Sequence, residues 1–266
     1  MNLKIFFKFV SISFQKQITY RFDYFVGIVN GFLYVFIFTS LWRALYSQFD
    51  VKEHNGFSMS EIITYAVVAM ALRIAFTMDD SIIYKKVQDG SIATELIRPT
   101  SFLFMNLAEN IGHSFFHFLA RTFPIVIISA CIYDISIPLE PLRIMAFFIS
   151  ALLGYLLLSM LHFAVGLLAF WFVEIFPFML FKYSLFTFFA GGIVPIDFFP
   201  DALKPLVDFL PFKHMLYSPT IIIMGRASLT DIHSILLTQF MWLLIMSGIG
   251  KIMWHAVRNK LIIQGG

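Results

Sequence analysis

The sequence SLFTFFAGGIVPIDFFPDALKPLVDFLPFKHMLYSP, residues 184–219, contains five of the ten prolines of the chain. It begins as apolar sequence typical of a lipid environment and then breaks at Ala190-Gly191-Gly192. A proline removes a backbone donor and clashes with the preceding turn, so no continuous helix crosses this stretch. Inside a bilayer, broken backbone is tolerated only where protein or water satisfies the released groups. The stretch therefore predicts a membrane helix that enters, breaks and continues as short amphipathic helices at the interface. An ordinary long loop is the alternative.

Composition places the chain among integral membrane proteins. Of its 266 residues, 59% are hydrophobic and only 13% are charged, and the mean hydropathy is +0.84. Charged residues make up about a quarter of a soluble protein. The formal net charge of +3 is small and no basic run occurs, so we expect no nucleic-acid partner. The single cysteine, Cys131, excludes an intramolecular disulfide.

The apolar segments predict an all-α polytopic membrane protein with a single transmembrane domain over residues 1–266. Residues 1–22 combine lysines with aromatic and aliphatic residues at helical spacing, which predicts an amphipathic helix at the membrane interface. A helix needs about 20 apolar residues to cross the hydrocarbon core. Six transmembrane helices are expected on this basis, at residues 24–44, 60–79, 102–132, 142–172, 176–196 and 234–256.

The distribution of Lys and Arg predicts the orientation. Six crossings put both termini on one side of the membrane, and most cations lie on that side. The positive-inside rule then places both termini in the cytoplasm and residues 197–219 at the outer surface as re-entrant helices. The cations on the cytoplasmic side are Lys4, Lys8, Lys16, Arg21, Lys85, Lys86, Arg98, Lys182, Lys251, Arg258 and Lys260. Those on the outer side are Lys52, Lys204, Lys213 and Arg226.

The cytoplasmic segment DSIIYKKVQDGSIATELIRPTS, residues 80–101, is too polar to span the membrane. It nevertheless has an apolar side, formed by Ile82, Ile83, Val87, Ile92 and Leu96. Asp89-Gly90 interrupts the segment and Pro99 ends it. An amphipathic element in this position either lies on lipid or docks a partner.

The proline-rich stretch resembles the fifth-helix region of ABC-2 type transporter permeases. The matching residues are Gly191, Gly192, Pro195, Phe199, Pro200, Pro205, Leu210, Pro211, Phe212, Tyr217 and Pro219. The resemblance covers nearly the whole chain and is closest to the compact branch without a large extracellular domain, the type V exporter fold. It implies one six-helix membrane half of an ABC exporter, which works with two ATPase subunits and a second permease copy or paralogue. ATP and Mg would be bound by the ATPase partner, and this chain would hold no cofactor.

The resemblance also implies roles for particular residues. Residues 81–98 correspond to the coupling helix, which sits in a groove of the ATPase subunit. Its matching residues are Val87, Asp89, Gly90, Ile92, Leu96, Arg98 and Pro99, and Glu174 in the next cytoplasmic loop is a candidate for a second contact. The outer gate would be formed by Gly191, Gly192, Pro195, Phe199, Pro200, Pro211 and Tyr217.

Polar residues recur inside the expected third span, where Glu109, His113, His117 and Arg121 follow one another at intervals of four. Ionisable groups within a membrane are costly and are functional candidates by default. This face either binds a metal through His113, His117 and Glu109, pairs with itself at a helix interface, or contacts substrate. Arg73, Asp79 and Asp80 are interpreted as an anchor of the second span.

A second pattern in the spans concerns helix packing. Gly27-x-x-x-Gly31 in the first span permits close helix approach, and a dimer seam is one form that approach takes.

The sequence contains no phosphate-binding loop, nucleophile elbow, HExxH or dinucleotide fingerprint. We therefore expect no catalytic residues and a transport subunit whose ATP is hydrolysed by a partner chain. The expected substrate is hydrophobic or amphipathic, and the expected location is the cytoplasmic membrane of a bacterium. Two alternatives remain: a membrane-embedded metal enzyme that uses the third span, and an ion-coupled carrier, although the internal repeat typical of many carriers is not visible.

Overall fold

The computed structural model describes residues 3–19, 21–49, 53–98 and 100–264. The described chain is almost entirely helical, with one short β-hairpin, which confirms the predicted class of all-α polytopic membrane protein. The elements are α1 Leu3–Ile18, α2 Arg21–Phe49, β1 Glu53–His54, β2 Phe57–Ser58, α3 Met59–Ala75, α4 Ile82–Gln88, α5 Ile92–Leu96, α6 Phe102–His117, a π-helical turn Phe118–Thr122, α7 Phe123–Ile132, α8 Pro141–Leu167, α9 Phe176–Phe189, α10 Lys204–Phe209, α11 Tyr217–Ile223 and α12 Leu229–Gln264.

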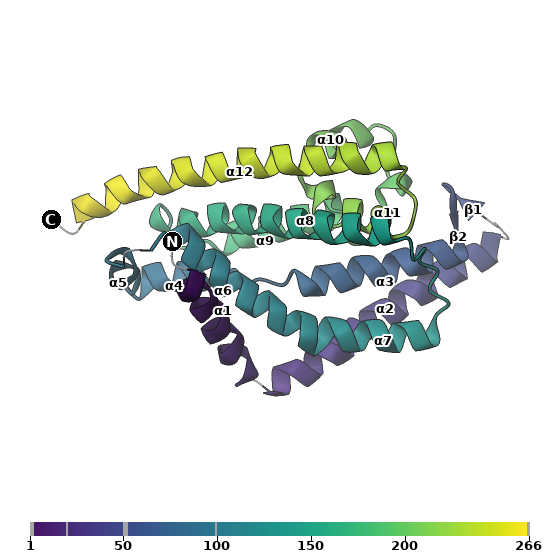
Figure 1. The fold of residues 1–266 in the computed structure, drawn as a ribbon, viewed down its shortest axis with the longest axis horizontal. Coiled ribbons are helices and arrows are strands. Elements are labelled where there is room, and N and C mark those ends of the chain that lie inside the picture. Colours follow the sequence, from purple (N-terminus) through teal and green to yellow (C-terminus); the bar gives the residue numbers. More distant parts are fainter. Residues whose placement is uncertain (1–2, 20, 50–52, 99, 265–266) are drawn as a thin grey trace.

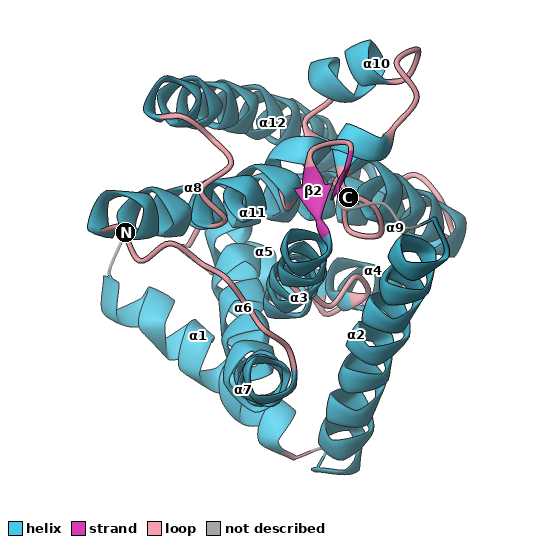
Figure 2. Ribbon diagram, turned by 90° about the vertical axis from the view of Figure 1, so that its right-hand side faces the viewer, coloured by secondary structure: helices cyan, strands magenta, loops and turns pink. Residues whose placement is uncertain are grey.

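The long helices lie side by side along the longest axis of the molecule (Figure 1). α4 and α5 lie at one end, where α1 also begins and α12 ends; we call this the α5 end. The β-hairpin and α10 lie toward the opposite end, which we call the hairpin end. Seen along the bundle, α3 lies among the other helices (Figure 2), and it contacts α2, α6, α7 and α11. α3 is therefore the central helix.

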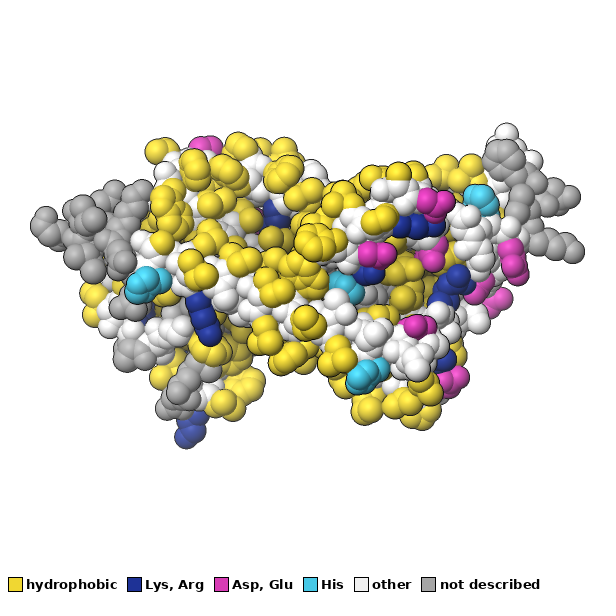
Figure 3. Space-filling view, turned by 90° about the horizontal axis from the view of Figure 1, so that it is seen from above, with side chains coloured by type: hydrophobic (Ala, Val, Ile, Leu, Met, Phe, Trp, Pro, Cys, Tyr) yellow, Lys and Arg dark blue, Asp and Glu magenta, His cyan; other side chains and the backbone are white. Residues whose placement is uncertain are grey.

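Among the described residues, four helices are long and apolar enough to cross a membrane: Phe25–Gln48, Phe102–Ile132, Pro141–Phe170 and Leu229–Val257. α3, with 17 residues, and α9, with 14 residues, are shorter. At about 1.5 Å per residue α9 is roughly 21 Å long, whereas the hydrocarbon core is about 30 Å thick. Six crossings therefore stay a prediction. Figure 3 shows hydrophobic side chains over the middle of one face, with charged side chains gathered toward the hairpin end.

Two expected spans end earlier than predicted. The second was expected to reach residue 79, but α3 ends at Ala75 and residues 76–81 are not helical. The fifth was expected to reach residue 196, but α9 ends at Phe189, immediately before Ala190-Gly191-Gly192. Residues 190–216 then form short helical turns and loops, so the chain contains two unwound segments.

The expected third span is interrupted by the π-helical turn Phe118–Thr122. Pro124 lies in the first turn of α7, directly after this turn. A proline inside a helix has no N–H to donate and clashes with the preceding turn. Widening that turn to the π geometry accommodates the proline without breaking the helix. Arg121 lies within this turn, so it departs from the regular helical spacing of Glu109, His113 and His117.

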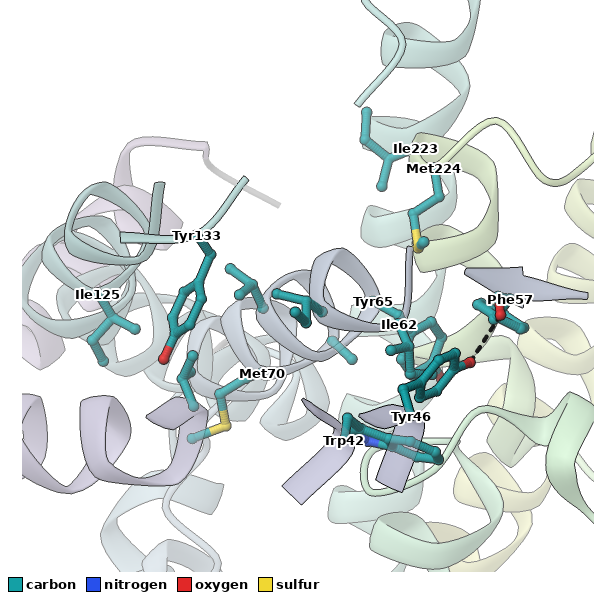
Figure 4. Close-up of a cluster of buried hydrophobic side chains, with 14 residues drawn as sticks. Trp42, Tyr46, Phe57, Ile62, Tyr65, Met70, Ile125, Tyr133, Ile223 and Met224 are labelled. Atoms are coloured by element: carbon teal, nitrogen blue, oxygen red, sulfur yellow. Dashed lines mark hydrogen bonds between the residues drawn. The ribbon is translucent and has the colours of Figure 1, made fainter. Parts of the chain in front are cut away.

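A buried cluster closes the hairpin end of the bundle (Figure 4). It joins side chains of α2, α3, α7, α11 and the hairpin, among them Trp42, Tyr65 and Tyr133. The hydroxyl of Tyr46 donates to the carbonyl of Phe57 at 2.8 Å, as the dashed line in Figure 4 shows. Arg226 lies over the Phe57 ring, 3.7 Å from its centroid, and pairs with Glu61 at 3.0 Å. Apolar packing and these polar contacts together fix the hairpin against α3.

Candidate functional site

A cavity of about 600 Å³ lies among α2, α3, α8, α9 and the π-helical turn. Its wall contains apolar side chains from each of the four helices. Three cations, Arg73, Arg121 and Lys182, also line it, whereas Asp80 is the one carboxylate among the lining residues. The cavity is therefore mostly apolar with a positively charged portion, and these are the properties of a site for small molecules.

Arg73 lies in the last turn of α3 and faces this cavity. Its guanidinium donates to the hydroxyls of Tyr34, at 3.4 Å, and of Tyr183. Both phenol rings also lie beside its Cζ atom, with centroids 5.4 Å and 5.6 Å away. Among the described residues no carboxylate lies within ion-pair distance of Arg73.

The contacts of Arg73 lower the free-energy cost of placing its charge in an apolar environment, but they do not neutralise the charge. An arginine costs at most about 2.5–3.5 kcal/mol on insertion scales, the value for the centre of a membrane helix. Each cation–π contact returns about 0.5–2 kcal/mol, and the C-terminal end of a helix dipole returns about 0.3–1 kcal/mol. The phenols are neutral, and a guanidinium has five N–H donors. The positive charge and part of the donor capacity of Arg73 therefore remain available inside the cavity.

Asp80 has two cationic or polar partners from neighbouring helices. Its Oδ1 atom pairs with the ammonium of Lys182 on α9 and lies 2.9 Å from Nδ1 of His162 on α8. The carboxylate of Asp80 joins the unwound segment to α8 and α9, and the interpretation of Asp80 as a membrane anchor stays a prediction.

The unwound residues 76–81 are held by polar side chains of α6 and α8. The carbonyl of Thr77 accepts from the hydroxyl of Ser114 at 2.7 Å and lies 3.1 Å from Nδ1 of His113. The carbonyl of Asp79 lies 3.0 Å from Nε2 of His162. Backbone groups released within a membrane must find such partners. The polar side chains of His113, Ser114 and His162 therefore satisfy backbone carbonyls of the segment that follows α3.

The polar face predicted on the third span is divided among different partners. Glu109 pairs with Lys86 of α4 at 2.7 Å, and Lys86 also pairs with Glu95 of α5 at 2.9 Å. His117 is buried with its ring 4.5 Å from that of His113. Arg121 lines the cavity. Within the described part of the chain no group of three His, Cys, Asp or Glu residues is arranged to hold a metal ion.

The Gly27-x-x-x-Gly31 pair lies against other helices of the same chain. A Cβ atom at Gly27 would be 2.2 Å from Nε of Arg121, and one at Gly31 would be 2.4 Å from Cδ1 of Ile125. The glycines thus make room for the π-helical turn and α7 to approach α2. The close approach that this pattern permits occurs within the chain.

The predicted coupling residues separate into a buried and an exposed set. Asp89 and Gly90 form the turn between α4 and α5, and Gly90 has a φ of 73°. Ile92 is buried and Val87 packs against the same cluster, whereas Asp89, Gly90, Leu96 and Arg98 are exposed. Pro99 lies outside the described residues.

Sequence analysis missed one residue of the exposed set. Ile97 directly follows α5 and is 84% exposed, the most of any residue of the segment with a large apolar side chain. Glu174 lies next to this element, since its Oε2 atom accepts from the hydroxyl of Tyr84 at 3.1 Å. The two predicted cytoplasmic contacts are therefore neighbours.

The predicted outer-gate residues form a compact region against α3. The hydroxyl of Tyr65 donates to the carbonyl of Gly191 at 2.6 Å, and the backbone N–H of Tyr217 donates to the carbonyl of Ala190 at 3.0 Å. The Tyr217 hydroxyl donates to Asp197 at 2.8 Å. Of the remaining predicted residues, Gly192, Pro195, Phe199 and Pro211 are buried and Pro200 is exposed.

These features define an α-helical integral membrane protein whose central helix ends in an unwound segment beside a partly charged cavity, an arrangement found in membrane transporters. A family model described as "ABC-2 family transporter protein" matches residues 5–265, and the chain belongs to this family. It is therefore a permease component of an ABC transporter, as the sequence predicted. No match was found among curated proteins or among solved structures.

The pair formed by Asp80 and Lys182 should be strongly coupled. We expect Asp80→Asn or Lys182→Met to lower the free energy of unfolding by up to about 3 kcal/mol each, because each leaves one charge of a largely buried pair without its partner. The double variant should lose less than the sum of the two. Unfolding of the purified protein in detergent measures this cycle.

Asp201 and Lys204 provide the control pair, because they also pair at 2.7 Å but are exposed. Their coupling should be at most about 1 kcal/mol. Equal coupling in the two cycles would show that the Asp80–Lys182 pair has no special structural role.

Gly191 and Gly192 should respond differently to alanine. Gly191 has a φ of 74°, and a Cβ atom there would lie 2.7 Å from the hydroxyl of Tyr65, whereas Gly192 has only ordinary contacts. We expect Gly191→Ala to lower the melting temperature by several degrees, since a left-handed backbone costs about 1–2 kcal/mol for a residue with a side chain. Gly192→Ala should change it by less, and equal shifts would contradict this account.

Proposed function

We propose that the chain is the membrane half of an ATP-driven exporter and that a separate ABC ATPase docks on its α5 end. The observation that carries this proposal is the exposed apolar tip formed by Leu96 and Ile97, which are 36% and 84% exposed. The tip lies at the C-terminal end of a helix only five residues long and beside the exposed Arg98. A short rigid element with exposed apolar side chains and a flanking cation is suited to a groove on another protein.

The segment behind the tip is anchored to the membrane helices, as a coupling element requires. Ile83 of α4 is buried, and a Cβ atom at Gly166 of α8 would lie 2.7 Å from its Cδ1 atom. Lys86 of α4 links to Glu109 of α6, and Asp80 links to Lys182 of α9. A push on the tip would therefore reach α6, α8 and α9 through side chains that pack or pair directly.

The proposed transport direction is outward, from the cavity past the hairpin end. Tyr65, Gly191 and Tyr217 hold this end closed through the hydrogen bonds described above. Rearrangement of the unwound residues 190–216 would open it.

In this proposal both termini and α5 are cytoplasmic, the membrane is the cytoplasmic membrane of a bacterium, and a second permease copy or a paralogue completes the transporter. ATP and Mg are held by the ATPase partner, and this chain contributes no cofactor.

The proposal is tested on the complex purified in mild detergent from its own cells through a tag on this chain. We expect ATP-hydrolysing protein to co-purify with the wild type. Replacing both Leu96 and Ile97 by Asp should reduce co-purified ATP hydrolysis at least about tenfold, since each buried aliphatic side chain contributes about 1.5–3 kcal/mol to an interface.

Leu139→Asp is the matched control, because Leu139 is 81% exposed but lies in the loop between α7 and α8 at the hairpin end. It should leave co-purification and hydrolysis unchanged. If the Leu96 and Ile97 variant retains full hydrolysis, or if no ATP-hydrolysing protein co-purifies with the wild type, the docking proposal fails.

A further inference from the structure

We propose that the cavity binds an amphiphile with an anionic head group, and that Arg73 is the principal ligand of the anion. This inference rests on the proposed function, because it names the chemical class of the cargo. It concerns the cavity among α2, α3, α8 and α9, which opens beside the unwound residues 76–78. The head group would be a phosphate or a carboxylate, the anions that a guanidinium fork binds in bidentate fashion.

Arg73 carries a positive charge, but its described partners are neutral. Its described partners are the two neutral phenols of Tyr34 and Tyr183, which hold the guanidinium in place and leave its charge uncompensated. An arginine that served only to pair helices would have a carboxylate opposite it, as Lys182 has Asp80. A charge positioned by aromatic side chains and directed into a cavity is instead arranged for an anion that comes from outside the chain.

The side chains that line the cavity carry more positive than negative charge. Arg73 and Lys182 line it, and Asp80 is the one carboxylate among its lining residues. That carboxylate already pairs with Lys182. The electrostatic potential in the cavity is therefore positive, and it attracts anions more strongly than it would in water because the surroundings have a low dielectric constant.

The apolar part of the cavity wall indicates which class of anion binds, an amphiphile or a soluble anion. Leu33, Ile37, Met70, Ile74, Leu158 and Phe186 line the cavity together with the cations. This surface offers nothing to inorganic phosphate or a sugar phosphate, but it suits an acyl or other apolar chain. A cargo with one anionic end and one apolar end satisfies both parts of the wall.

The test measures equilibrium binding of radiolabelled oleoyl lysophosphatidic acid to the full chain, purified in a non-ionic detergent, without ATP. Unlabelled monoolein, which has the same acyl chain without the phosphate, and glycerol 3-phosphate, which has the phosphate without the chain, serve as competitors. We expect each to compete at least about tenfold less well than unlabelled lysophosphatidic acid, the factor that one charge-assisted interaction supplies.

Arg73→Gln should weaken lysophosphatidic acid binding at least about tenfold, since glutamine keeps hydrogen bonding to the two phenols but removes the charge. Arg73→Lys keeps the charge without the planar fork and should give an intermediate affinity. Arg43→Gln is the matched control, because Arg43 also lies over a tyrosine ring, 5.2 Å from the centroid of Tyr133, but it does not line the cavity. The Arg43→Gln variant should bind lysophosphatidic acid as tightly as the wild type does.

Two results would overturn the inference. If monoolein or glycerol 3-phosphate competes as well as lysophosphatidic acid, the cavity selects only a chain or only a free anion. If Arg73→Lys and every folded Arg73 variant bind as tightly as the wild type, Arg73 is not the ligand. The experiment is independent of ATPase docking, because the variant with Asp at positions 96 and 97 should bind lysophosphatidic acid normally. Failure of docking and failure of anion binding are therefore distinguishable.

Discussion

Backbone groups that leave a helix within a membrane have no water to bond, so their partners must come from the protein. The described part of this chain has two largely non-helical segments that follow helices of the expected spans, residues 76–81 after α3 and residues 190–216 after α9. Side chains of His113, Ser114 and His162 contact carbonyls of the first segment. Tyr65 and Tyr217 bond the carbonyls at the start of the second. This constraint accounts for Ser114 and His162, two buried polar residues in an otherwise apolar chain.

The same constraint connects the proposed functional parts. α3 has the first unwound segment at one end, while near its other end Tyr65 contacts the second. Arg73 lies between these positions, beside the cavity. A change in the first segment would therefore alter the cavity wall and the central helix together. Unwound segments held by discrete side-chain hydrogen bonds can exchange partners, whereas continuous helices resist deformation, which makes these segments suitable for transmitting motion.

Much of the architecture could be predicted from the sequence because it depends on local signals. The apolar composition, the proline-rich stretch and the Asp89-Gly90 break act within a few residues of themselves, and the resemblance to ABC-2 permeases rested on them. Asn55-Gly56 is also a strong hairpin signal, and both residues have positive φ values. The hairpin was missed because each of its strands has only two residues.

The candidate site was less predictable because it depends on contacts distant in sequence. Residues 76–81 contain no proline or glycine, so no helix-breaking residue predicts the end of α3. The break is held by residues of α6 and α8, between about 30 and 90 positions away. Intervals of four suggested one polar face on the third span, but Glu109 pairs with Lys86 and Arg121 lies within a π-helical turn. Arg73 and Lys182 could be recognised as cavity residues only after the fold had brought α3 and α9 together.

If a partner hydrolyses ATP for this chain, as proposed, nucleotide binding by that partner changes the segment between α3 and α5. Hydrogen–deuterium exchange on the complex purified from its own cells, with and without a non-hydrolysable ATP analogue, tests this most directly. We predict altered exchange at residues 76–98 in the complex and no effect of the analogue on the isolated chain. Unchanged exchange at residues 76–98 in the complex would contradict the account, and so would an equal response of the isolated chain, because that would place the nucleotide site in this chain itself.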